Sequence, residues 1–531
     1  MGNDSSKRSN FRRLPGRALA SFALVLLLAG CAGIGSRSTP EYRTDAAQKV
    51  FARAYENIFD KYIEALATPN FAMDGIAGLS SIDESLGVRR RGPHVLLTVS
   101  GTEVARFPAP EADNIEAWAR LTTNVIDAGR ERSVLLKAAM AEDIYTAVLN
   151  AAVSHLDRHS RYAGLRSARD SRAQREGFGG VGIRLNFDRG LPEIITVMPD
   201  TPAEHSDLKA GDIIIEVDGA AVAGLDRDAI VWRLRGEVGS EASLLVRRKD
   251  AAEPVRVSVR RALIVSQTVH LRKQENLAVI TLTGFNQRTA RNLNRTLETV
   301  SRMRPRPAGI VLDLRGNPGG LLDQAVAVAD SFLDRGRIVS TRGRHPDSYQ
   351  VFNANGRDRA PSMPLAVLIN GQSASAAEIV AAALQDQGRA ILIGSNSYGK
   401  GTVQNITRLP NDGELVLTWS RFHAPSGYAL ENLGVMPNFC STVSAAGSRD
   451  SPIDQQALDV TIVLAAWRAH SGYDAASAKG LRERCPRRSE KPDQDIEIAA
   501  RVLSDRSLYA RAVGASVPAV ARRRDQGATL H

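Results

Sequence analysis

The chain is poor in cysteine and in aromatic residues. It has three cysteines among 531 residues, and aromatic side chains make up 5% of the total. Neither Cys440 nor Cys485 has a second cysteine or a histidine at the spacing of a metal site. No basic surface is interleaved with aromatic side chains, as nucleic-acid binding would require. The sequence therefore predicts no metal, no cofactor and no nucleic-acid partner.

The chain also lacks an apolar run long enough to span a bilayer near its start. Residues 18–29 are apolar and follow five basic residues, but they are too short to cross a membrane. They lead into Leu-Ala-Gly-Cys ending at Cys31, the small-residue pattern that a lipoprotein signal peptidase accepts. We expect residues 1–30 to be a lipoprotein signal peptide and Cys31 to carry the lipid. An ordinary signal peptide or a buried helix is the alternative.

Such a signal predicts where the protein works. A lipid on Cys31 would anchor it on the periplasmic side of a bacterial cell envelope, and Ala32 after the cysteine favours the outer membrane. Cys440 and Cys485 then form an even pair in an oxidising compartment, which favours a disulfide. Their spacing does not show that the two sulfur atoms are close, so two separate buried thiols remain the alternative.

A serine at a predicted strand-to-helix corner is the first chemical feature. Residues 365–369 are an apolar run that ends in the turn Asn370-Gly371, and residues 374–384 form an alanine-rich helical pattern that contains Ser375. A hydroxyl at a helix N-terminus lies among backbone N–H groups without helical partners, and these can stabilise an oxyanion. We expect the N–H of Ala376 to be one such donor.

A lysine 25 residues after this serine is the second feature. A serine hydroxyl needs a base, and a lysine serves only when burial lowers its pKa from about 10.4. Lys400 follows the apolar residues 390–394 and stands between two glycines, which allow close backbone approach. Gln404 could hydrogen-bond the amine. A capping serine and a solvated lysine are the alternative for each segment alone, whereas the two segments together predict a peptidase.

With the segment Asp-Leu-Arg-Gly-Asn-Pro-Gly-Gly at residues 313–320, these features resemble the carboxyl-terminal processing peptidases, also called tail-specific proteases. The resemblance runs from about residue 133 to residue 438. It implies that Ser375 is the nucleophile, Lys400 the general base and Gln404 the residue that orients the lysine.

The same resemblance bears on the oxyanion hole and the fold. It implies a second backbone donor from Gly319 or Gly320, without deciding between them, and a crotonase-like core over residues 264–440. Short apolar runs alternate with helical patterns in this region, as in βαβ units of mainly parallel strands. The expected strands are residues 279–282, 309–314, 365–369 and 391–394, and the expected helices are residues 288–303, 321–333 and 374–384.

Residues 177–263 have short strands with glycine turns and one helix at 226–234, an order that resembles a PDZ domain. Residues 179–183 are expected to open its first strand. PDZ domains add a peptide as a strand and hold its terminal carboxylate with N–H groups of a glycine-rich loop. The expected peptide-binding residues are Gly180, Val181, Gly182 and Ile183.

The remaining regions are predicted to be helical. Residues 31–172 would be a linker and a mostly helical region, with helical spacing over residues 46–67 and 135–156, and residues 441–531 a helical extension. Asp157, His159 and Ser160 could suggest a catalytic triad. A hydrogen-bonded brace is the better interpretation, since three residues so close in sequence cannot easily converge as nucleophile, base and orienter.

The sequence thus predicts a multidomain α/β protein with a peptidase core, an inserted PDZ domain and a helical N-terminal region. We expect a lipid-anchored serine endopeptidase that processes or degrades exported proteins from their C-terminal tails. A catalytically silent PDZ scaffold that binds such tails is the alternative, and a core that uses a histidine as its base is a weaker one. Expected partners are proteins or peptides with free C-termini and the membrane; an adaptor protein and a homo-oligomer are left open.

Overall fold

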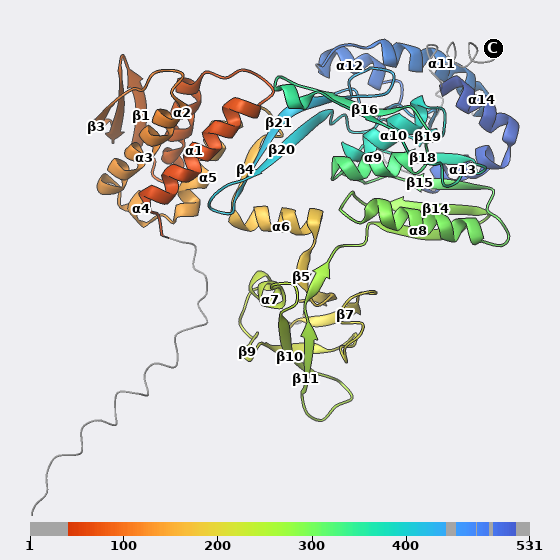
Figure 1. Ribbon diagram of the computed structural model, residues 1–531, viewed down its shortest axis with the longest axis horizontal. Coiled ribbons are helices and arrows are strands. Elements are labelled where there is room, and N and C mark those ends of the chain that lie inside the picture. The colour runs from red at the N-terminus through yellow and green to blue at the C-terminus, as the bar shows by residue number, and fades with distance from the viewer. Residues whose placement is uncertain (1–40, 189, 442–452, 474, 488–491, 517–531) are drawn as a thin grey trace, which may run out of the picture.

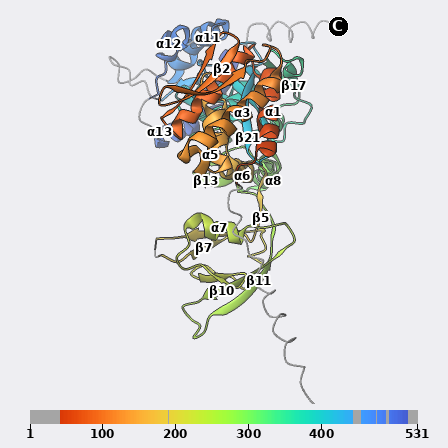
Figure 2. The ribbon, with the colours of Figure 1, turned by 90° about the vertical axis from the view of Figure 1, so that its left-hand side faces the viewer.

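The computed structural model describes residues 41–188, 190–441, 453–473, 475–487 and 492–516. The N-terminal unit and the core lie on either side of a twisted sheet, and a small domain projects from them in both views (Figures 1 and 2). Among the described residues we find no helix with the length and apolar character needed to cross a bilayer. Cys31 and the predicted signal peptide lie outside this part of the chain.

The N-terminal unit packs helices against a small antiparallel sheet. Its elements are α1 (Thr44–Lys61), α2 (Thr68–Ala77), η1 (Gly78–Ser81), β1 (Leu86–Arg91), β2 (His94–Val99), β3 (Thr102–Pro108), α3 (Ile115–Arg132), α4 (Val134–Ala138) and α5 (Ala141–Ser154). The prediction of a mostly helical region missed this sheet, because the exposed arginines at the end of β1 interrupt its apolar alternation. The helical pattern over 135–156 is in fact two helices, separated at Met140, whose backbone is extended.

The core is a six-stranded sheet that is buried on both faces. Its strands, in spatial order, are β13 (Val269–Gln274), β14 (Leu277–Leu282), β15 (Gly309–Asp313), β18 (Leu365–Ile369), β19 (Ile391–Gly394) and β22 (Phe439–Cys440). All neighbours pair in parallel except β13 and β14. Continuous apolar runs are typical of parallel strands covered on both sides. The four predicted core strands are confirmed.

Helices from distant parts of the chain cover the two faces. One face packs against α8 (Thr289–Arg302), α9 (Leu322–Asp330) and α10 (Ala376–Asp386), which are the three helices predicted for the core. The other face packs against α13 (Pro492–Ser504) and α14 (Arg506–Ser516) of the C-terminal extension. Alternate residues of β14 separate the two layers, since Ile280 belongs to the first cluster and Val279 to the second.

A second sheet lies between the core and the N-terminal unit. Its strands are β17 (Gln350–Asn353), β16 (Arg337–Arg342), β21 (Glu414–His423) and β20 (Thr402–Arg408), with β4 (Arg161–Ala163) paired to β21 and η2 (Pro346–Ser348) beside it in sequence. The β20–β21 hairpin follows directly on Lys400, since β20 begins two residues after it.

The projecting domain is joined to the body by α6 (Leu165–Glu176), β5 (Phe178–Gly180) and β12 (Ala262–Ile264) (Figure 1). Its sheet has the order β11-β10-β8-β7-β6, and its elements are β6 (Ile183–Asn186), β7 (Glu193–Val197), β8 (Ile213–Val217), β9 (Ala220–Ala221), α7 (Arg227–Leu234), β10 (Glu241–Arg247) and β11 (Val255–Arg260). Residues 179–183 do lead into a strand, β6, but it begins only at Ile183, and Gly179 and Gly180 belong to the separate strand β5. The backbone leaves β5 after Gly180 and turns at Gly182, whose φ is +90°, a value that favours glycine.

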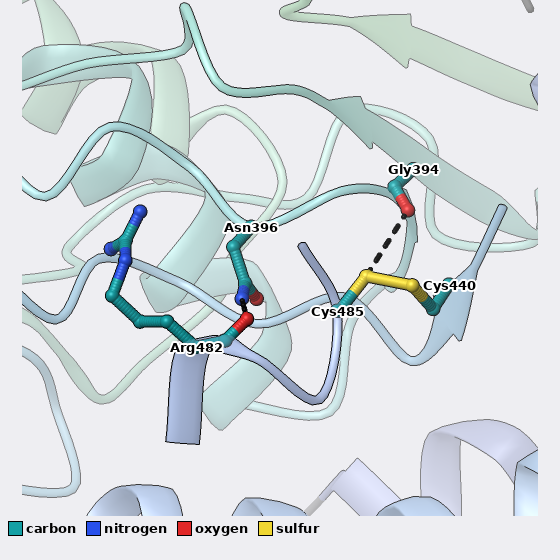
Figure 3. The surroundings of a disulfide bond; sticks show 5 residues. All are labelled: Gly394, Asn396, Cys440, Arg482 and Cys485. Atoms are coloured by element: carbon teal, nitrogen blue, oxygen red, sulfur yellow. Dashed lines mark hydrogen bonds between the residues drawn. A yellow bond between two sulfur atoms is a disulfide. The ribbon is translucent and has the colours of Figure 1, made fainter. Parts of the chain in front are cut away.

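The C-terminal extension also contains α11 (Ile453–Ala469) and α12 (Ala475–Arg482). It is tied to the core by a disulfide between Cys440 of β22 and Cys485, which follows α12 (Figure 3). Cys485 is fully buried. An oxidised sulfur carries no proton, so the 3.6 Å approach of Cys485 Sγ to the Gly394 carbonyl is a packing contact.

Candidate active site

One cleft of about 590 Å³ is lined by all the predicted catalytic and oxyanion-hole residues. It lies between the core, the second sheet and α6, and a volume of this size is typical of ligand sites. Its lining includes Ser375, Ala376, Lys400, Gln404 and the glycine pair at 319–320. These residues come from three segments that are far apart in sequence, so their convergence follows from the fold.

Ser375 occupies a strained backbone position at the start of α10. Its φ is +54° and its ψ is −113°, backbone angles that residues other than glycine rarely adopt. β18 ends at Ile369, and the turn before Ser375 reverses the chain so that α10 packs back on the sheet. The predicted strand-to-helix corner is therefore present, with Ser375 at its apex and only partly buried.

Glu378, which the sequence analysis did not assign, ties this corner to the lysine loop. Its Oε2 accepts the backbone N–H of Ser375 at 2.7 Å and that of Lys400 at 2.9 Å. Its Oε1 accepts the N–H of Gly399 at 2.6 Å and the hydroxyl of Ser397 at 2.5 Å. Burial raises the pKa of Glu378, while these four hydrogen bonds lower it.

Two backbone N–H groups near Ser375 are left without an acceptor. No described residue accepts the N–H of Ala376, the first residue of α10, or that of Gly320. The N–H of Gly319, in contrast, donates to Asn317 Oδ1 at 2.9 Å. Gly319 lies so close to Ser375 that a Cβ placed on Gly319 would be 2.9 Å from Cβ of Ser375. Of the two glycines, Gly320 therefore has the free donor.

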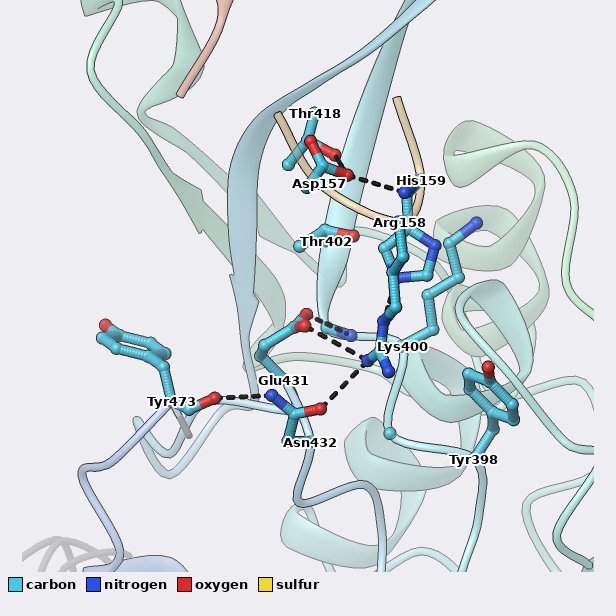
Figure 4. A network of polar contacts seen from close by, with 12 residues as sticks. Asp157, Arg158, His159, Tyr398, Lys400, Thr402, Thr418, Glu431, Asn432 and Tyr473 are labelled. Atoms are coloured by element: carbon cyan, nitrogen blue, oxygen red, sulfur yellow. Dashed lines mark hydrogen bonds and ion pairs between the residues drawn. The ribbon is translucent and has the colours of Figure 1, made fainter. Parts of the chain in front are cut away.

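Lys400 lies in surroundings that favour its neutral form. Burial is the main cause that lowers the pKa of its amine, and the cation of Arg161 lowers it further. The carboxylates of Glu378, Glu431 and Asp157 act in the opposite direction. Figure 4 shows the Lys400 side chain running beside Arg158 and the ring of His159. No hydrogen bond joins Lys400 Nζ to Ser375 Oγ among the described contacts.

Gln404 lines the same cleft, but among the described residues no hydrogen bond joins it to the lysine amine. Its Nε2 donates to Thr402 Oγ1 at 2.9 Å and to Thr418 Oγ1 at 3.4 Å. A register shift between Val403 and Gln404 in the β20–β21 pairing moves the side chain along the strand. The hydrogen bonds of Gln404 are made within its own hairpin, and its predicted role as orienter stays a prediction.

Asp157, His159 and Ser160 form a brace beside the cleft. Asp157 Oδ1 accepts the backbone N–H of His159 at 2.7 Å and the hydroxyl of Thr418 at 3.0 Å (Figure 4). Ser160 Oγ donates to Asp157 and accepts the N–H of Thr418 on β21. Burial, with a contribution from Lys400, lowers the pKa of His159 to about 4. These contacts tie the end of the N-terminal unit to β21, as the brace interpretation predicts.

The residues predicted to bind a peptide line a separate groove in the projecting domain. This groove, of about 200 Å³, includes Gly180, Val181, Gly182 and Ile183 on one side and Val231 and Leu234 of α7 on the other. It is therefore mainly apolar and lies beside the exposed side of β6, the last strand of its sheet.

Known protein families match the core and the projecting domain. The family model of peptidase family S41 matches residues 276–440, and the PDZ domain model matches residues 193–248. A carboxy-terminal-processing protease of Bartonella bacilliformis is 36% identical over 335 residues, which cover 62% of this chain and 76% of that protein. Carboxy-terminal processing protease CtpA of Bacillus subtilis is 32% identical over 261 residues, covering 49% of this chain and 55% of that one.

Among solved structures, the photosystem II D1 C-terminal processing protease is 23% identical, with a TM-score of 0.39, over 74% of this chain and 92% of that chain. The predicted family and the predicted PDZ domain are confirmed by the matched families and by the first of these relatives. This chain belongs to peptidase family S41, as a multidomain α/β member of the carboxy-terminal-processing serine proteases.

Proposed function

We propose that this protein is an endopeptidase with a Ser375–Lys400 dyad that cleaves exported proteins selected by their C-terminal tails. One observation carries the proposal. A half-buried lysine and a strained serine line the same cleft, next to two backbone N–H groups that have no acceptor among the described residues.

The proposed reaction uses these groups in turn. Lys400 Nζ takes the proton of Ser375 Oγ as the oxygen attacks the carbonyl carbon of the scissile peptide bond. The N–H groups of Ala376 and Gly320 donate to the oxyanion that forms. The lysine then returns its proton to the leaving amine, which leaves an acyl group on Ser375. Water, deprotonated by the neutral lysine, hydrolyses this ester.

The dyad must close before this can happen. Lys400 Nζ does not donate to Ser375 Oγ in the structure, although Glu378 holds the two backbones together. Catalytic hydrogen bonds are often long before substrate binds. A rotation of the lysine side chain within the cleft would complete the dyad without moving the backbone of either residue.

Tail selection would occur in the projecting domain. Its apolar groove beside the turn at 180–183 suits an apolar last residue, with the terminal carboxylate at the turn. The Leu-Ala-Gly-Cys pattern supports a lipid anchor on Cys31 and a place on the periplasmic side of the envelope. That location would limit the substrates to proteins that reach the periplasm, and the groove would select among them by their C-terminal tails.

A direct assay tests the activity. The mature protein and its Ser375→Ala variant are incubated with an unfolded protein that ends in an apolar residue, and the fragments are identified by mass spectrometry. We expect cleavage by the first and none by the second. Binding of the tail without cleavage by either protein would favour the silent scaffold.

A further inference from the structure

We propose that Arg482 and Arg487 of the C-terminal extension are positioning residues that hold the loop carrying Lys400, and that the Cys440–Cys485 disulfide keeps them in place. The inference rests on the proposed Ser375–Lys400 dyad. It concerns residues beyond position 440, where the S41 match ends.

The two guanidinium groups bind carbonyl oxygens of the lysine loop, which we define as residues 395–401. Arg482 Nη2 donates to the Ser397 carbonyl at 2.9 Å, and Arg487 Nη2 donates to the same oxygen at 2.8 Å. Arg487 also donates to the carbonyl of Tyr398, and its guanidinium lies 5.1 Å from the centroid of the Tyr398 ring. Arg482 Nη1 reaches the carbonyls of Asn432 and Leu433 on the neighbouring segment.

The loop is thus held from two sides. Its N–H groups at Gly399 and Lys400 donate to Glu378, and its carbonyls at Ser397 and Tyr398 accept from the arginines. The lysine loop has no regular secondary structure after β19, so these contacts replace the ladder that would otherwise fix its backbone.

Arg487 also contacts the nucleophile side of the cleft. A Cβ placed on Gly371 would lie 2.7 Å from Cδ of Arg487, so the arginine stem rests on the turn that precedes Ser375. One side chain therefore touches the turn of the nucleophile and the loop of the base. A third catalytic segment meets the extension too, since Arg315 Nη1 pairs with the buried Asp495 of α13 at 2.8 Å.

The cost of this arrangement points to a role beyond packing. Burial lowers the pKa of Arg482 to about 10, whereas Arg487 is more exposed, and neither has an ion-pair partner among the described residues. A partly buried cation such as Arg482, without a counter-charge, is unfavourable unless its hydrogen bonds are well made. Here those bonds go to the carbonyl oxygens of Ser397 and Tyr398, which lie three and two residues before Lys400.

The disulfide holds the segment that carries the two arginines against the core. Cys485 stands between them in sequence and is bonded to Cys440 at the edge of the core sheet (Figure 3). Asn396 adds two hydrogen bonds, because its Nδ2 donates to the Arg482 carbonyl at 2.7 Å and its N–H donates to the Cys485 carbonyl at 3.4 Å. Release of Cys485 would let residues 482–487 leave the lysine loop.

The test compares Arg487→Ala with Arg484→Ala, a control that removes the same charge from an exposed side chain that makes no hydrogen bond or ion pair with any described residue. Peptide hydrolysis is measured across pH with a short substrate that does not need the projecting domain. In Arg487→Ala we expect kcat at neutral pH to fall about tenfold, with KM unchanged. We also expect the midpoint of the pH-dependent rise to move upward, because a loosened loop exposes Lys400 to water. A smaller folded fraction would lower the rate at every pH and leave the midpoint in place.

Two further arms separate the outcomes. Reductant should move the midpoint of the wild type upward, as Arg487→Ala does. The double variant Cys440→Ala/Cys485→Ala lacks the disulfide, so its midpoint should already be shifted and should not respond to reductant. Hydrogen exchange of the lysine loop should be faster in Arg487→Ala than in Arg484→Ala, a readout that needs no catalysis. Equal exchange in the two variants, or an unshifted midpoint, overturns the inference. An inactive wild type whose loop exchange still responds to Arg487 would overturn the Ser375–Lys400 dyad alone.

Discussion

Ser375 and Lys400 are joined through a single atom. Their backbone N–H groups both donate to Oε2 of Glu378, at 2.7 and 2.9 Å. Because one buried oxygen receives both donors, the separation of the two backbones is set by hydrogen-bond lengths on either side of it. The proposed nucleophile and base therefore share one anchor, although 25 residues separate them in sequence.

The first prediction concerns this anchor. Glu378→Gln should lower both activity and stability, because an amide has only one acceptor oxygen and its NH₂ group would face backbone donors. Leaving two buried donors unpaired should reduce the free energy of unfolding by at least about 2 kcal/mol. Denaturant unfolding and peptide hydrolysis measure the two effects.

Glu298→Gln is the matched control, since it removes the same charge from an exposed residue of α8. It should leave both quantities unchanged. Wild-type stability and rate in Glu378→Gln would mean that the shared anchor is unnecessary.

The second prediction concerns the pH at which the lysine becomes a base. Burial and Arg161 lower the pKa of Lys400, so activity should rise with pH at a midpoint below the ordinary lysine value of about 10.4. Arg161→Gln removes a cation that disfavours the charged amine. The pKa of Lys400 should then rise, and the midpoint should move to higher pH. Arg291→Gln, on the exposed side of α8, should not move it.

A matching profile alone would not identify the titrating group. Lys400→Ala should abolish hydrolysis, whereas Lys273→Ala, a change at an exposed lysine of β13, should have no effect. Substantial cleavage by Lys400→Ala would remove this lysine from the mechanism.

Much of the core could be predicted because its signals are local. Each parallel strand is a short apolar run. The turn residues before Ser375 and the alanine-rich helix after it indicate the corner that carries this residue. Glu378 also had a local signal that was missed, since Ser-x-x-Glu at a helix start is the pattern of a capping box.

The remaining features depend on contacts between distant segments. Arg482 and Arg487 reach the Ser397 carbonyl across 85 and 90 residues, and no periodicity or spacing encodes such a pairing. The hydrogen bonds of Gln404 depend on a register shift in its hairpin, which the strand pattern does not reveal. The sheet at β1 to β3 was missed because its charged residues obscure the alternation.

The third prediction concerns the anchor at Cys31, which lies outside the described residues. Cys31→Ala should prevent lipidation and release of the signal peptide by the lipoprotein route, because it removes the thiol that would carry the acyl chains. Mass analysis of the mature N-terminus should find an acylated Cys31 in the wild type. A mature chain that begins elsewhere, without a lipid, would contradict the lipoprotein assignment.

The fourth prediction concerns the end of the substrate. If the turn at 180–183 holds a terminal carboxylate, amidation of the last residue should lower kcat/KM, because the amide brings N–H donors toward donors of the same kind. A coupling of ordinary size would give a ratio of free acid to amide between about 5 and 150. Equal cleavage of the two substrates would show that the domain does not read tails.

The last prediction concerns how tail binding could reach the dyad. Helix α6 leads into the projecting domain, and three of its arginines bind the turn of the β20–β21 hairpin. Arg169 pairs with Asp412 at 2.9 Å, and Arg172 and Arg175 pair with the buried Glu414 at 3.0 and 2.8 Å. The same hairpin continues from the lysine loop, so a movement of α6 would be transmitted toward Lys400.

Glu414→Gln should loosen this connection, because it removes the charge that two arginines share. We expect the ratio of free acid to amide cleavage to fall toward one while hydrolysis of the amide persists. Once the connection is loosened, a bound tail would favour the active and the inactive arrangement equally and would not shift the equilibrium between them. Glu176→Gln, at the exposed end of α6, is the control and should keep the full ratio. Tail binding measured separately should be unchanged in both variants. An undiminished ratio in Glu414→Gln would mean that the tail signal reaches the cleft by another route, such as the β12 connection.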